Sequence, residues 1–184
     1  MSAGQARLSP ASLYGYERGS LLVPLQFLDL PSDLRLLGHH WRRKPELHVT
    51  AANTTSIAQR IRGPLALGAG AAEDAAWAAL SDATRTRAVG DVVLSDEYRY
   101  VHRDADRTLI ALCHVEMLDD LYRHLSERLG ADIEPPPTHI TLYTNPGGEG
   151  IGLHTRDELE RDTSRLAAGD AAELHRAIDE ATSR

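Results

Sequence analysis

The sequence contains one cysteine, Cys113, and one lysine, Lys44. A single cysteine excludes an intramolecular disulfide and a zinc site built from several cysteines. Because Cys113 ends the apolar run 109–113, we expect it to be a buried strand residue. Nearly all positive charge is carried by arginine, which suits bidentate phosphate binding, although the Ala- and Arg-rich composition explains this usage more simply.

Aromatic residues, long apolar runs and excess positive charge are also scarce. Aromatics make up 5% of the chain, and no segment approaches the ~20 apolar residues of a membrane-spanning helix. The N-terminal segment 1–7 lacks the apolar core of a signal peptide. We therefore expect a cytoplasmic, monomeric protein without a membrane partner. The net charge of −7 argues against binding to duplex DNA but permits a small phosphate ligand in a locally positive cleft.

The order of expected elements indicates one α+β domain over residues 1–184, with residues 1–18 loosely ordered. A hydrophobic content of 42% is sufficient for a packed core. Strands and helices lack a strict βαβ rhythm, and a hairpin is expected around 103–106, which favours antiparallel pairing. The expected strands are 21–30, 46–52, 91–102, 107–115 and 139–144. The expected helices are one or two turns over 31–38, then 54–62, 71–85, 117–130 and two more beginning near Thr155 and Asp170.

Two segments share a His-x-Thr pattern with a β-branched centre: 48–50 reads His-Val-Thr and 139–141 reads His-Ile-Thr. In a strand, residues i and i+2 point to the same face, so each His stands beside its Thr while the central residue enters the core. A similar segment, 124–126, lies in an expected helix, where i and i+2 project about 200° apart. It is therefore not counted as a third copy.

The paired residues suit chemistry on a phosphate ester. Imidazole exchanges protons near neutral pH, so His48 and His139 could act as general acid and general base, in an order that the sequence does not decide. The hydroxyls of Thr50 and Thr141 could donate to non-bridging phosphate oxygens. Neither a metal ion nor a cofactor is required by this scheme. The alternative is that both segments are ordinary strand residues.

With these residues in place, the chain resembles the two-histidine (2H) phosphoesterase superfamily, also called LigT-like. Its members carry two His-x-Thr/Ser motifs, separated here by 139 minus 48, or 91 residues. The resemblance implies a bilobed α+β fold, with two antiparallel sheets flanked by helices and a central cleft. It also implies metal-independent cleavage of a 2′,3′-cyclic phosphate or related 2′-phosphodiester, and it allows an RNA 2′-5′ ligase activity. The substrate would be a nucleotide, an RNA end or a nucleotide-derived ester, and the alternative is a binding protein that uses the same cleft without turnover.

The two halves of this site are not equivalent, because Ala-Ala follows the first motif and Leu-Tyr the second. By alternation Tyr143 shares a face with His139, where it could stack on a base or pack on a nearby loop. Arg42 could steer an anionic substrate, although a solvated basic loop is the simpler interpretation. Tyr98 and Tyr100 face either the cleft or an ordinary strand surface.

Other features carry less information. The Gly-rich stretch 147–152 lacks the Lys-Ser/Thr of a nucleotide-binding loop and is expected to be a turn at the cleft edge. The adjacent pair 39–40, both histidines, is a poor metal site because neighbouring histidines rarely point at one ion. Arg99 and Arg103 could bind phosphate only if their face of the sheet is concave. His154 receives no role from the sequence.

Overall fold

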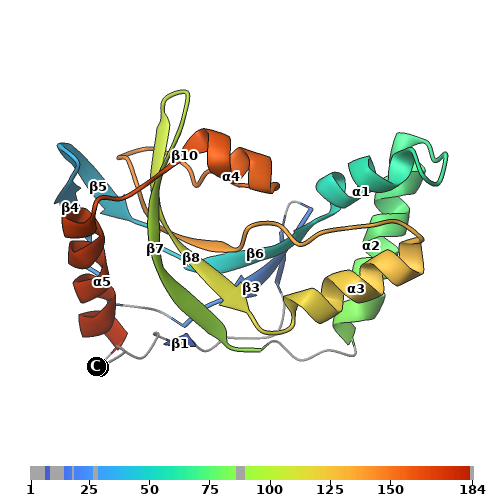
Figure 1. Ribbon diagram of the computed structural model, residues 1–184, viewed down its shortest axis with the longest axis horizontal. Helices are drawn as coiled ribbons and strands as arrows, with labels where there is room; N and C mark the ends of the chain where they lie inside the picture. The colour runs from blue at the N-terminus through green and yellow to red at the C-terminus, as the bar shows by residue number, and fades with distance from the viewer. Residues whose placement is uncertain (1–6, 9–14, 18, 27–28, 86–89, 183–184) are drawn as a thin grey trace.

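The computed structural model describes residues 7–8, 15–17, 19–26, 29–85 and 90–182. Within these ranges ten strands form one antiparallel sheet, and five helices surround it (Figure 1). The main strand order is β1-β7-β8-β9-β6-β3-β2, with β10 paired to β7 and β5 paired to both β4 and β9. The strands are β1 (Arg7–Leu8), β2 (Gly15–Glu17), β3 (Ser20–Pro24), β4 (Asp33–Leu36), β5 (His39–Arg43), β6 (His48–Asn53), β7 (Val92–Arg103), β8 (Asp106–Val115), β9 (His139–Thr144) and β10 (Thr163–Arg165). The helices are α1 (Thr54–Arg62), α2 (Ala69–Arg85), α3 (Leu118–Leu129), α4 (Arg156–Asp162) and α5 (Ala168–Thr182).

Two hydrophobic clusters hold the layers together. The larger one joins inward-facing residues of the sheet to α1, α2, α3 and α5, and the smaller one joins Val101 and Ile110 of the sheet to Leu159 of α4. Figure 1 shows α1–α3 gathered at one end of the sheet, α5 at the other end and α4 between them. Since β8 contributes Leu109 and Ala111 to one cluster and Ile110 to the other, its two faces are both covered.

The α+β class and the antiparallel pairing are confirmed, and several boundaries match the sequence pattern. Helix α1 spans 54–62 as expected, because Asn53 caps it by accepting a hydrogen bond from the Ser56 N–H at 3.0 Å. Helix α3 ends at Gly130, which adopts the left-handed conformation with φ 59°. Thr155 caps α4 in the same way as Asn53 caps α1. The second capping signal was placed wrongly, because α5 begins at Ala168 and Asp170 lies inside its first turn.

The helical turns expected over 31–38 are wrong. This segment forms β4, which makes a hairpin with β5 through a two-residue turn at Leu37 (φ 55°) and Gly38 (φ 72°). Two consecutive positive φ angles are those of a type I′ turn, whose twist suits a hairpin. The buried Trp41 secures the hairpin, since its indole N–H donates to the Leu36 carbonyl at 2.9 Å.

The two separate sheets implied by the family resemblance are also not observed, because the described strands are connected. The connection is the antiparallel pair of β6 and β9, in which Val49 lies opposite Ile140. Of residues 1–18, expected to be loosely ordered, β1 and β2 are described as strands, and the remaining positions lie outside the described residues. None of the helices in the described ranges is both long enough and apolar enough to span a bilayer.

Candidate active site

The two His-x-Thr segments lie side by side on neighbouring strands. Val49 of β6 and Ile140 of β9 are paired and completely buried, so both central residues enter the core. In this antiparallel register, His48 lies opposite Thr141 and Thr50 lies opposite His139. Because all four lie one residue from the buried pair, they project from the other face of the sheet. The fold therefore joins two distant segments into one group of two imidazoles and two hydroxyls.

A cleft of about 610 Å³ opens over this group. All four motif residues line it, together with the Gly-rich segment 147–152 and the segment that joins β5 to β6. This volume is in the usual range for a small-molecule site. The expectation that 147–152 borders a cleft is confirmed by the lining, and the turn begins with a Gly148 N–H to Asn145 carbonyl bond of 2.9 Å.

His139 is the most buried of the four side chains. It is 8% exposed, and its Nδ1 lies 3.0 Å from the Pro137 carbonyl. A carbonyl only accepts, so Nδ1 carries the proton in this contact. Burial lowers the pKa of His139, and charge on the nearby His48 and His154 acts in the same direction, whereas backbone hydrogen bonds at Pro137 and Ile151 oppose it. The neutral imidazole is therefore the favoured form near pH 7.

Tyr143 does not share the cleft face with His139, so the stacking position predicted for it is wrong. Leu109 of β8 pairs with Tyr143, but the next residue, Ile110, pairs with Thr141. Leu142 is therefore the extra residue of a β-bulge, and it reverses the alternation beyond it. Tyr143 is completely buried in the larger hydrophobic cluster, and Thr144 lines the cleft in its place.

Tyr98 and Tyr100 also lie away from the cleft, so the prediction that they face it is wrong. Tyr98 is 2% exposed, and its hydroxyl lies 2.9 Å from Nδ1 of His175 on α5. Tyr100 packs edge-to-face on Trp41 with ring centroids 5.9 Å apart. Both side chains therefore point to the face of β7 that packs against the main core and α5.

The basic residues of β5 and the segment after it do reach the cleft. Arg42 and Lys44 both line it, as does Arg43, although the Arg43 guanidinium donates to the Leu30 carbonyl at 2.5 Å. Arg99 and Arg103, on the other hand, hold α4 and β10 to the sheet. Arg99 donates to Thr163 at 2.9 Å, and Arg103 pairs with Asp162 at 2.8 Å.

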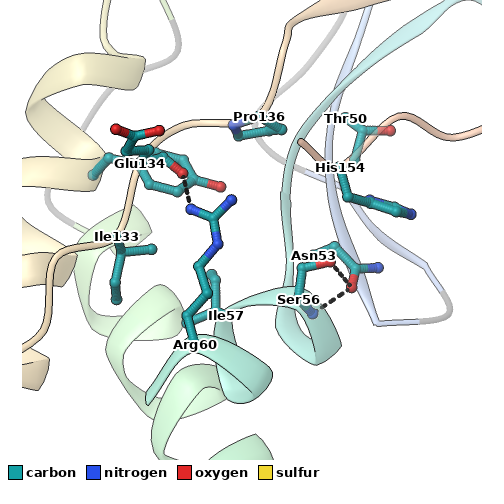
Figure 2. Close-up of a pocket in the computed structure, with 10 residues that line it drawn as sticks. Thr50, Asn53, Ser56, Ile57, Arg60, Ile133, Glu134, Pro136 and His154 are labelled. Atoms are coloured by element: carbon teal, nitrogen blue, oxygen red, sulfur yellow. Dashed lines mark hydrogen bonds between the residues drawn. The ribbon is translucent and has the colours of Figure 1, made fainter. Parts of the chain in front are cut away.

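A second, smaller pocket adjoins the cleft at Thr50 (Figure 2). In Figure 2, Thr50 and His154 lie on one side of it, and Arg60 of α1 lies on the other side. Arg60 donates to the Glu134 carbonyl at 2.8 Å. Sequence reasoning missed His154 and Arg60, and no motif marks them. Their only sequence signal is that α1 and the Gly-rich stretch directly follow the two motif strands.

Cys113 is a buried strand residue of β8, as expected. Burial raises the pKa of its thiol to about 12, so it offers no thiolate nucleophile near neutral pH. His40, considered above as a metal ligand, instead pairs with Asp33 at 2.9 Å. Within the ranges described, no group of three or more His, Cys, Asp or Glu side chains is arranged to hold a metal ion.

Comparison with known proteins gives no relative for this chain: no family model, curated protein or solved structure matches it. The assignment of a function therefore depends on the residues of the cleft.

Proposed function

We propose that the protein is a metal-independent phosphodiesterase of the 2H phosphoesterase type, acting on a 2′,3′-cyclic phosphate or related 2′-phosphodiester. The observation that supports it best is the register of β6 and β9, which sets His48 opposite Thr141 and Thr50 opposite His139 in one cleft. We interpret the parts of the fold on either side of this strand pair as the two lobes of that family. Nucleotides, RNA ends and small nucleotide-derived esters are the substrates that suit this chemistry.

The roles of the two histidines follow from the environment of His139. Its lowered pKa favours a neutral ring, which can accept a proton. His139 then takes a proton from water as the water oxygen attacks phosphorus, and His48 gives a proton to the departing ribose oxygen. One P–O bond forms and one breaks, so a cyclic diester becomes a phosphate monoester. Thr50 and Thr141 donate to the non-bridging oxygens, on which charge develops.

The experiment is turnover of 2′,3′-cyclic mononucleotides in the presence of a chelator. His48→Asn and His139→Asn should each lower kcat by about 10²–10⁴-fold, the usual contribution of a general acid or base. His124→Asn is a matched control, because His124 belongs to the similar tripeptide on α3 and does not line the cleft. Turnover that survives either cleft substitution would refute the proposal, and tight binding without turnover would favour a binding protein.

The assignment of His139 as the base has its own test. A base with a lowered pKa stays competent in mildly acidic solution, so the acidic limb of kcat/KM should lie below the ordinary histidine pKa of about 6.5. An acidic limb at or above that value would mean either that His48 is the base and His139 the acid, or that neither histidine has the proposed role.

A further inference from the structure

Beyond the four motif residues, the lining of the cleft has many charged residues and glycines and few apolar side chains. Its apolar members are Leu22, Pro45 and Ile151, and among the described lining residues the only aromatic rings are the two imidazoles. A nucleobase is usually held by an aromatic or broad apolar surface. A sugar-phosphate is held instead by cations, hydroxyls and N–H groups, which are what this cleft offers.

Lys44 is one of the three cations that line the cleft, with Arg42 and Arg43. Its backbone N–H donates to the Leu142 carbonyl at 2.9 Å, which fixes it beside the bulge of β9. A Cβ built on Gly150 would lie 3.6 Å from the Lys44 ammonium and 3.7 Å from the Thr141 hydroxyl. The ammonium and the hydroxyl are therefore no more than the sum of these distances, 7.3 Å, apart.

Among the residues that the structure describes, no carboxylate lies within ion-pair distance of the Lys44 ammonium. Glu46 and Glu149 also line the cleft, and both are exposed to solvent, whereas Lys44 is half-buried. The attraction between an ammonium and an anionic ligand is stronger where the ammonium is half-buried, because less water screens the two charges. Arg42, on the strand before it, also lines the cleft.

We propose that Lys44, with Arg42, forms a subsite for a second phosphate of the substrate. This inference rests on the proposed function: the histidines cut one phosphate ester, and Lys44 binds another phosphate joined to the same molecule. The preferred substrates are then nucleotides with both a 2′,3′-cyclic phosphate and a further phosphate, either a terminal 5′-phosphate or the internucleotide phosphate of an RNA end. A nucleoside 2′,3′-cyclic phosphate with a free 5′-hydroxyl leaves this subsite empty.

The test compares substrates that differ only in the second phosphate. For the unaltered enzyme, kcat/KM should be at least about 10-fold higher with a 5′-phosphate than with a 5′-hydroxyl, the worth of one charge-assisted hydrogen bond. Lys44→Met should bring this ratio close to one, and Lys44→Arg should restore part of it. Arg176→Met, which removes an exposed charge on α5, should leave the ratio unchanged. A dinucleotide substrate shows whether an internucleotide phosphate occupies the subsite equally well.

Two kinetic results would overturn the inference: no preference for the second phosphate in the unaltered enzyme, or an equal loss on both substrates in Lys44→Met. The second would place Lys44 on the phosphate being cut. A binding measurement separates this inference from the proposed function, since it needs no turnover. Calorimetry should show a nucleoside 3′,5′-bisphosphate binding about 10-fold more tightly than the 3′-monophosphate, with the difference lost in Lys44→Met. Equal affinities would reject the subsite whether or not the protein is an enzyme.

Discussion

His48 lies opposite Thr141 across the β6–β9 strand pair, so each histidine has the threonine of the other motif as its lateral neighbour. Each half of the site therefore combines the histidine of one motif with the threonine of the other. A phosphate above the Val49–Ile140 pair would meet a hydroxyl and an imidazole from each strand. This arrangement makes the contributions of the two threonines comparable and testable.

Removal of either hydroxyl should weaken catalysis without unfolding the protein. Thr50→Val and Thr141→Val each delete one donor to the charged phosphate and should lower kcat/KM by about 10–10³-fold, as for other oxyanion donors. Both side chains are only half-buried, so the midpoint of urea unfolding should change little. Thr50→Ser and Thr141→Ser should retain most activity.

Thr55→Val on the exposed surface of α1 serves as the control for these variants, because Thr55 does not line the cleft. If Thr50→Val were as active as Thr55→Val, the phosphate would not lie over the strand pair.

Substitutions of Tyr143 should act on stability rather than on substrate binding. Its side chain is completely buried, and its hydroxyl has no hydrogen-bond partner among the described residues. Tyr143→Phe removes this unsatisfied group and should leave the free energy of unfolding unchanged or raise it by about 1 kcal/mol. Tyr143→Ala leaves a cavity and should cost about 3–5 kcal/mol. Chemical denaturation measures both, and an unchanged stability in Tyr143→Ala with a raised KM would restore the cleft position for this residue.

The local pattern of the sequence was sufficient to predict most helices and strands and the four residues of the central site. His48, Thr50, His139 and Thr141 each lie in a regular strand, where alternation alone decides the face, and the structure brings all four into one cleft.

The misplaced residues depend on features that local pattern does not encode. The bulge at Leu142 is visible only in the pairing with β8, and it reverses the face of Tyr143. The hairpin turn at Leu37 needs a positive φ at a non-glycine residue, which the sequence does not signal. Arg60 reaches the smaller pocket through the packing of α1 against the segment around residue 134, a contact between distant parts of the chain. His154 lines the same pocket from the segment before α4.

The pH dependence of stability should carry the signature of His139. In the unfolded chain its imidazole has a pKa of about 6.5, whereas burial lowers the pKa in the folded protein. Below about pH 6.5 the unfolded state therefore binds a proton that the folded state does not. The contribution of this residue to the free energy of unfolding falls as pH falls, by at most about 1.4 kcal/mol per pH unit, and levels off below the folded-state pKa.

Urea unfolding of the unaltered protein and of His139→Gln between pH 5 and pH 7.5 measures this contribution. The variant should show a shallower loss of stability on the acidic side and the same slope above pH 7. His124→Gln on α3 controls for the removal of a histidine elsewhere. Parallel curves for the unaltered protein and His139→Gln would mean that the imidazole titrates as freely in the folded state as in the unfolded one.

Gly150→Ala should obstruct the cleft while leaving the fold intact. The added methyl would lie 3.4 Å from Cε of Lys44 and 3.7 Å from the Thr141 hydroxyl, which are tolerable contacts, and Gly150 does not adopt a left-handed backbone. The free energy of urea unfolding should therefore change by no more than about 0.5 kcal/mol, as for an ordinary surface substitution. Because the methyl occupies space between the two groups that we place on phosphates, KM should rise several-fold, and more for a substrate with a 5′-phosphate than for one without. Gly38→Ala is the contrasting variant, because Gly38 lies in the β4–β5 turn and does not line the cleft. Its φ of 72° makes alanine unfavourable by about 1 kcal/mol, and the new methyl contacts nothing within 4 Å. A loss of stability with unchanged KM in Gly38→Ala, and the reverse in Gly150→Ala, would separate backbone strain from occupation of the cleft. An unchanged KM in both variants would show that the substrate does not extend between Lys44 and Thr141.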